Sequence, residues 1–132
     1  FFRLTQDQEG LGKAGDLVGL EVNMRPSGGY TPDMYNYADE TDVYKIWADM
    51  ICFDKSTKPL GTRRFCAFAG RRDGRTYQMD HDAIMAKYGS RLKMVQRVPK
   101  ALSGAMADMM YVANYDTEEE MMEAFQRMCE TW

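Results

Sequence analysis

The chain has 132 residues, of which 45% are hydrophobic and 28% charged, a composition typical of one globular domain with a sizeable core. Its 17 basic and 20 acidic side chains give a formal net charge of -3, which favours neither nucleic acid nor an anionic membrane surface as a partner. No apolar run approaches the roughly 20 residues of a membrane-spanning helix, and the first residues lack the pattern of a secretory signal. We therefore expect one domain that neither crosses a membrane nor is directed to secretion.

The first half of the chain is predicted to form a β-hairpin followed by two helices. Residues 1–4 and 17–24 are strand-like and flank a polar, glycine-containing loop. Because the first residue is not Met and residues 1–4 already resemble the inside of a strand, we expect the chain to begin within a fold. Thr31 and Pro32 favour a short helix over 31–38, and Thr41 and Asp42 begin a longer one. An apolar stripe on the longer helix, which we expect to face the core, consists of Val43, Ile46, Trp47, Met50 and Ile51.

The second half is predicted to be a smaller α+β region. Residues 54–62 are polar and contain proline and glycine, so we place a boundary there, between 1–55 and an appended region at 56–132. The Asp73-Gly74 dipeptide favours a hairpin turn. Asp80 can cap the start of a helix, and Thr117 begins a capping box. The elements expected here are strands at 64–70, 75–79, 92–98 and 109–115, and helices at 80–88 and after 117. The predicted class is α+β, with antiparallel strands and packed helices.

The cysteines indicate a reducing compartment. Cys52, Cys66 and Cys129 are odd in number, far apart and set in apolar stretches, without the spacing of a zinc site. We expect three reduced, buried thiols, and therefore a cytoplasmic protein without disulfides.

The segment 17–25 carries the pattern that bears most directly on chemistry. In a strand, alternate side chains point to opposite faces, so Glu21, Asn23 and Arg25 would share one face. The apolar side chains Val18, Leu20, Val22 and Met24 would be buried on the other. A carboxylate and an amide oxygen are hard ligands suited to Mg²⁺, which usually also binds substrate phosphates. An arginine beyond them could stabilise a phosphoryl group.

A solvated edge strand would also explain this alternation. Asparagine is depleted in strands, however, and the Pro-Ser-Gly-Gly loop that follows allows close approach of backbone to a ligand. Both features favour the interpretation as a ligand site.

The run Gly19-Leu-Glu-Val-Asn-Met-Arg-Pro-Ser-Gly-Gly29 resembles the end of the nucleotide site in ATP-grasp enzymes, and the looser resemblance extends to about Phe53. Within that superfamily the run is most similar to the group containing carboxylate-amine ligases, biotin carboxylases and the large chain of carbamoyl-phosphate synthase. The resemblance implies that Glu21 and Asn23 bind the Mg²⁺ ions, or Mn²⁺ in their place, that bridge the phosphates of ATP. It implies that Arg25 is catalytic and contacts phosphate or the acyl-phosphate intermediate. The implied substrate is a small carboxylate.

Other parts of the ATP-grasp pattern are missing from this sequence. Residues 1–4 contain no acid, and neither the lysine-bearing strands nor the glycine-rich flap is present. After Arg25, Pro-Ser-Gly-Gly replaces the Gln-Val-Glu-His of biotin carboxylases, which argues against bicarbonate chemistry. We therefore expect the C-terminal portion of a longer ligase, whose main partner is the remainder of its own enzyme.

Two alternatives stay open: a non-catalytic α+β regulatory or interaction module, and a complete chain that forms its site as a homo-oligomer through its N-terminal strand edge. The single histidine, His81, fits a surface or capping role, and the roles of Ser27, Thr31 and Asp33 near the loop are open. The second predicted hairpin is basic because it carries Arg63, Arg64, Arg71, Arg72 and Arg75. This basic group could meet phosphate or an acidic partner, although a solvated hairpin is the simpler interpretation.

Overall fold

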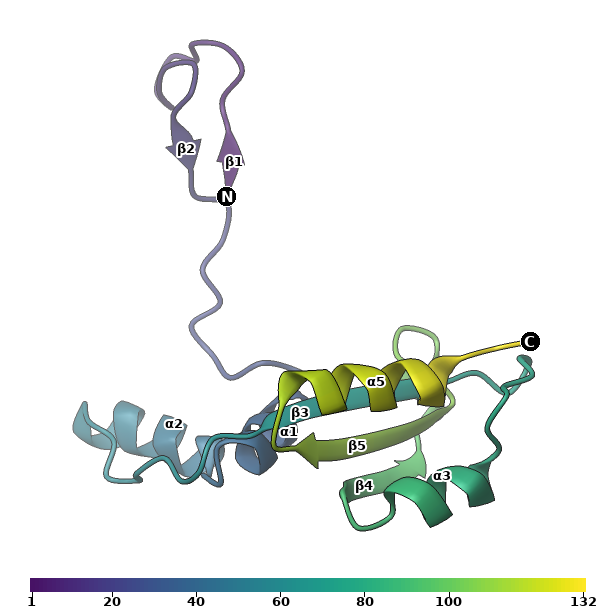
Figure 1. The fold of residues 1–132 in the computed structure, drawn as a ribbon. Helices are drawn as coiled ribbons and strands as arrows, with labels where there is room; N and C mark the ends of the chain where they lie inside the picture. The colour runs from purple at the N-terminus through teal and green to yellow at the C-terminus, as the bar shows by residue number, and fades with distance from the viewer.

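A computed structural model describes all 132 residues and shows an α+β fold with two small antiparallel sheets and five helices (Figure 1). The strands are β1 (Phe2–Arg3), β2 (Leu17–Val18), β3 (Phe65–Arg71), β4 (Leu92–Arg97) and β5 (Met109–Tyr115). The helices are α1 (Thr31–Ala38), α2 (Val43–Phe53), α3 (His81–Tyr88), α4 (Lys100–Ser103) and α5 (Glu118–Cys129). No helix has the length and apolar composition needed to cross a membrane.

The larger sheet has the strand order β3-β5-β4, and both neighbours run antiparallel to β5. β5 is central because its side chains are apolar on both faces, and residues 110–115 are all buried. The prediction of a strand at 75–79, paired with β3 across Asp73-Gly74, is wrong. β3 pairs with the more apolar β5 instead, and the 75–79 segment keeps a single bridge, between Tyr77 and Thr131.

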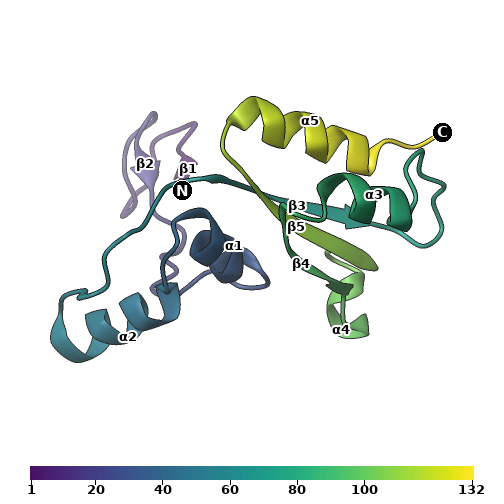
Figure 2. The ribbon, with the colours of Figure 1, turned by 60° about the horizontal axis from the view of Figure 1, so that its bottom comes forward.

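Two layers of helices cover the larger sheet (Figure 2). α3 and α5 lie on one face, where Ile84 and Met128 pack against Tyr111 and Ala113 in the main core. On the other face α1 packs against β3 and β5, and a smaller core forms around Met110. α1, which precedes the predicted boundary at residue 55, is joined to the sheet by a 2.5 Å hydrogen bond from Asn114 Nδ2 to the carbonyl of Tyr37.

Local capping chemistry explains where most helices begin. The side chains of Asp42, Asp80 and Thr117 accept hydrogen bonds from backbone N–H groups in the first turns of α2, α3 and α5, as predicted. α1 begins as predicted but differs in its cap. Thr31 is the first helical residue, Tyr30 precedes the helix, and no side chain caps it.

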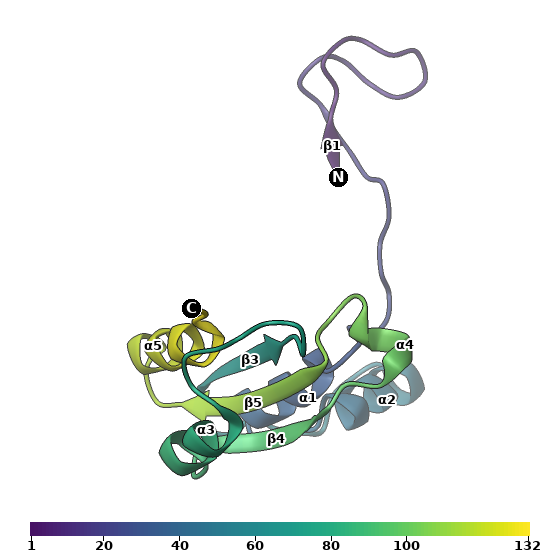
Figure 3. The same ribbon diagram turned by 90° about the vertical axis from the view of Figure 1, so that its right-hand side faces the viewer.

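The N-terminal hairpin stands apart from the rest of the fold (Figure 3). β1 and β2 pair through only two residues each, and the Leu4 N–H donates to the carbonyl of Asp16 at 3.0 Å. Leu4 is buried within the hairpin loop, but no sheet layer covers the strands. The hairpin agrees with the prediction, although its second strand ends at Val18 rather than at Met24.

Candidate functional site

The candidate site lies on the segment 19–29, which joins the hairpin to α1. β2 ends at Val18, and the residues from Gly19 to Arg25 continue as chain without sheet partners. The one backbone hydrogen bond within this stretch runs from the N–H of Met24 to the carbonyl of Val22, at 3.1 Å. Figures 1 and 3 both show this connection crossing open space between the hairpin and the helices.

The prediction that an apolar face is buried behind Glu21 is wrong. Leu20, Val22 and Met24 are 76%, 73% and 79% exposed, and only Val18 is partly covered. The physical reason is that these 132 residues supply neither a second strand beside the segment nor a layer against which its apolar side chains could pack. The alternating pattern is present, but the contacts that it implies are not made within this chain.

Glu21 and Asn23 are the donors predicted to bind metal. Both side chains are exposed, and neither makes a hydrogen bond or an ion pair. No group of three or more histidine, cysteine, aspartate or glutamate side chains is arranged to hold a metal ion. One carboxylate and one amide oxygen fit Mg²⁺ as part of a ligand set, because Mg²⁺ takes few protein ligands and fills its shell with water and phosphate oxygens.

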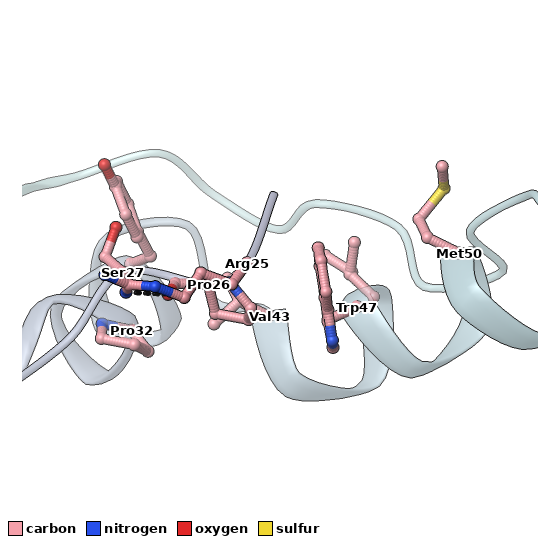
Figure 4. A pocket seen from close by; sticks show the side chains of 9 residues that line it. Arg25, Pro26, Ser27, Pro32, Val43, Trp47 and Met50 are labelled. Carbon is pink, nitrogen blue, oxygen red and sulfur yellow. Dashed lines mark hydrogen bonds between the residues drawn. The ribbon is translucent and has the colours of Figure 1, made fainter. Parts of the chain in front are cut away.

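Arg25 lines a shallow pocket of about 270 Å³ between the connecting segment and the first two helices. Its Nη1 atom donates to the carbonyl of Pro26 at 3.2 Å, a contact that keeps the guanidinium beside the Pro-Ser turn. Figure 4 shows Arg25, Pro26 and Ser27 on one side of the pocket and Val43, Trp47 and Met50 of α2 on the other. A positive charge therefore stands at the edge of an apolar recess.

The apolar stripe of α2 forms one side of this pocket rather than part of a core. Val43, Ile46, Trp47 and Met50 line the pocket together, which confirms that they share a helical face. None of them belongs to either core cluster, and Met50 and Ile51 are exposed. The prediction that this stripe faces the core is thus wrong, because α2 packs mainly against α1.

A buried carboxylate fixes the far end of α2. Asp49 accepts hydrogen bonds from the Thr57 hydroxyl at 2.6 Å, the Thr57 N–H at 3.2 Å and Lys45 Nζ at 3.0 Å. These bonds, above all the one from the Thr57 hydroxyl, hold the pKa of Asp49 below its ordinary value. The contacts join α2 to the following loop, so Asp49 has a structural role.

The three thiols are free, as predicted. Burial raises the pKa of Cys66 to about 11 and also raises that of Cys129, which makes both poor nucleophiles at neutral pH. The prediction that all three are buried is wrong: Cys52 is exposed on α2, and Cys66 and Cys129 are half-buried.

His81 is exposed, as predicted, but it does not cap a helix. It is the first residue of α3, Asp80 is the cap, and His81 Nδ1 lies 2.8 Å from the hydroxyl of the buried Tyr111. No local signal predicts this contact, because the partners are 30 residues apart.

Comparison with known proteins yields no match: no family model, curated protein or solved structure corresponds to this chain.

Proposed function

We propose that this chain is the C-terminal portion of an ATP-dependent ligase of the ATP-grasp type. In such an enzyme ATP phosphorylates a small carboxylate to an acyl phosphate, and an amine or a similar nucleophile then displaces phosphate. Glu21 and Asn23 would bind magnesium, which would neutralise charge on the ATP phosphates. Arg25 would contact the transferring phosphoryl group, where a guanidinium stabilises developing charge.

The observation that carries this proposal is the unpartnered segment from Gly19 to Arg25. Free backbone N–H and C=O groups of an extended segment can pair with a further strand, and apolar side chains are rarely exposed in such a regular row. Here Leu20, Val22 and Met24 all stand in solvent, next to free backbone groups. A chain with these properties is suited to join a sheet that other residues supply.

Joining such a sheet would produce the arrangement that the sequence pattern predicts. A strand beside the segment would use its free backbone groups, and a layer behind it would cover Leu20, Val22 and Met24. Glu21, Asn23 and Arg25 would then project from the opposite face, toward a nucleotide. We assign the sheet and the layer to the remainder of the enzyme.

The pocket beside Arg25 supports the same arrangement. Arg25, at the end of the extended segment, lines this pocket together with Val43, Ile46, Trp47 and Met50 of α2, so the segment leads directly to an apolar surface. An interdomain contact would bury this surface and would keep the Arg25 guanidinium at its edge. Charge at the edge and apolar side chains inside are typical of a site between two domains.

Trapping with hydroxylamine tests the proposed reaction in the complete enzyme. Hydroxylamine attacks an acyl phosphate to give a hydroxamate, so incubation with Mg-ATP and a panel of amino and dicarboxylic acids should yield hydroxamate together with an equal amount of ADP. Omitting the acid is the control, and should abolish both products. An enzyme that forms neither ADP nor hydroxamate with any acid would instead support the alternative of a non-catalytic interaction module.

A further inference from the structure

A second pocket, of about 440 Å³, lies at one end of the three-stranded sheet and shares no residue with the pocket beside Arg25. Its charged lining consists of Arg71, Arg72, Arg75, Arg97 and Asp73. The lining thus holds four guanidinium groups and one carboxylate, with Asp108 behind Asp73, in a protein whose overall charge is negative. His81 and the buried Tyr111 complete one wall.

Strand pairing brings these arginines together. Arg71 ends β3 and Arg97 ends β4, and both are paired with Met109, the first residue of β5. Residues directly opposite one another project from the same face of a sheet, so the two arginines flank Met109 on the face that carries α3. The loop after β3 then contributes Arg72 and Arg75 to the same pocket.

Arg71 is the buried part of this cluster. The residue is only 7% exposed, and its guanidinium lies 3.9 Å from the centre of the Tyr77 ring. One Nη atom donates to the carbonyl of Met79 at 2.5 Å, whereas Nε is buried and has no partner. A buried cation without a carboxylate beside it is costly, and a bound anion in the pocket would offset that cost.

The other arginines differ in how many of their guanidinium donors already have hydrogen-bond partners. Arg72 is held by the carbonyls of Ser103 and Gly104, so it positions α4 and contributes charge rather than free donors. Arg97 forms a two-bonded ion pair with Asp73. Arg75 is exposed, and its side chain makes neither an ion pair nor a hydrogen bond.

The Asp73 carboxylate pairs with the Arg97 guanidinium at the position where an external anion could bind. Their side chains are 60% and 63% exposed, and exposed ion pairs contribute little to stability because water screens them. The backbone N–H of Asp73 donates a hydrogen bond to the Asp108 carboxylate at 3.1 Å, so the loop stays in place without the Asp73 side chain. An arriving anion can therefore displace this carboxylate at small cost.

We propose that this pocket binds the phosphate group of a small molecule. Arg75 and Arg97 would contact the phosphate oxygens, and Arg71 would supply buried positive charge behind them. A phosphate group carries up to two negative charges and several acceptor oxygens, which suits guanidinium groups converging from two strands and a loop better than a single carboxylate does. The pocket is larger than a phosphate ion needs, so it leaves room for an esterified phosphate.

Calorimetric titration of the 132-residue chain tests this site with three probes: inorganic phosphate, glycerol 3-phosphate and succinate. We expect at least one phosphate compound to bind more tightly than succinate, and the tighter of the two distinguishes a free from an esterified phosphate as ligand. Arg75→Ala and Arg97→Ala should each weaken that binding by roughly tenfold. Asp73→Asn should strengthen it, since Arg97 is then free.

Arg63→Ala is the matched control, because it removes an exposed arginine that lies just before β3, at the end of the strand away from this pocket. Its affinity for phosphate should equal that of the wild-type chain, and circular dichroism should show unchanged folding in every variant. Binding of succinate as tight as that of both phosphate compounds, or the same loss in Arg63→Ala as in Arg75→Ala, overturns the proposal. So does weaker binding by Asp73→Asn.

Discussion

Truncation of Ile84 tests where the core of this fold lies. Ile84 is fully buried between α3 and the sheet, within the cluster that contains Tyr111 and Met128. Ile84→Ala removes three buried carbon atoms, which at about 0.8 kcal/mol each amount to about 2.4 kcal/mol of lost transfer free energy. The cavity left behind adds to this, so we expect a loss of about 3–4 kcal/mol in the free energy of unfolding.

Ile51→Ala is the matched control, because the same side chain is removed from a helix but at a position that is 67% exposed. It should change the free energy of unfolding by less than about 0.5 kcal/mol. Urea denaturation followed by circular dichroism measures both variants. A loss below about 1 kcal/mol for Ile84→Ala, or equal losses for the two variants, would refute the placement of the core around β5.

Three further predictions concern Asp49, the thiols and the isolated chain. Because its pKa is lowered in the folded state, Asp49 stabilises the fold above the ordinary carboxyl pKa of 3.8 and loses that effect as pH falls through its folded pKa. Thermal unfolding of Asp49→Asn should therefore show a deficit at neutral pH that shrinks in acid; a deficit that is independent of pH would contradict this role. A thiol reagent at neutral pH should modify the exposed Cys52 well before Cys66, whose pKa is raised to about 11, and equal rates would count against the described burial. Calorimetry should detect weak or no binding of Mg-ATP to the 132-residue chain, because Glu21 and Asn23 provide too few charges for magnesium; micromolar affinity would favour a complete or oligomeric site.

Short-range signals account for the elements that could be predicted from the sequence. The Asp80 and Thr117 caps act within one helical turn, so α3 and α5 begin where local chemistry places them. The mostly apolar run Met109–Tyr115 is a strand with the predicted bounds. Its apolar side chains lie on both faces, so the segment is recognisable as a buried strand without knowing which elements cover it.

Long-range pairing accounts for what could not be predicted. The sequence places Arg97 far from Arg71, and only their shared pairing with β5 brings them to one pocket. The failure at Leu20 and Val22 has a different cause. Their alternation with polar residues predicts a strand, but no strand or layer among these residues pairs with or covers the segment, so it forms no sheet beyond Val18.

The most direct test of the central proposal is ATP-dependent turnover of the complete enzyme carrying Glu21→Gln. The substitution removes the carboxylate charge but preserves size, so we expect turnover to fall by roughly 10²-fold or more, as for the loss of a group that acts on the transferring phosphoryl. Glu9→Gln, in the exposed hairpin loop, is the matched control and should leave turnover unchanged. Turnover of Glu21→Gln equal to that of the Glu9→Gln control would contradict the assignment of this segment to the metal and phosphate site.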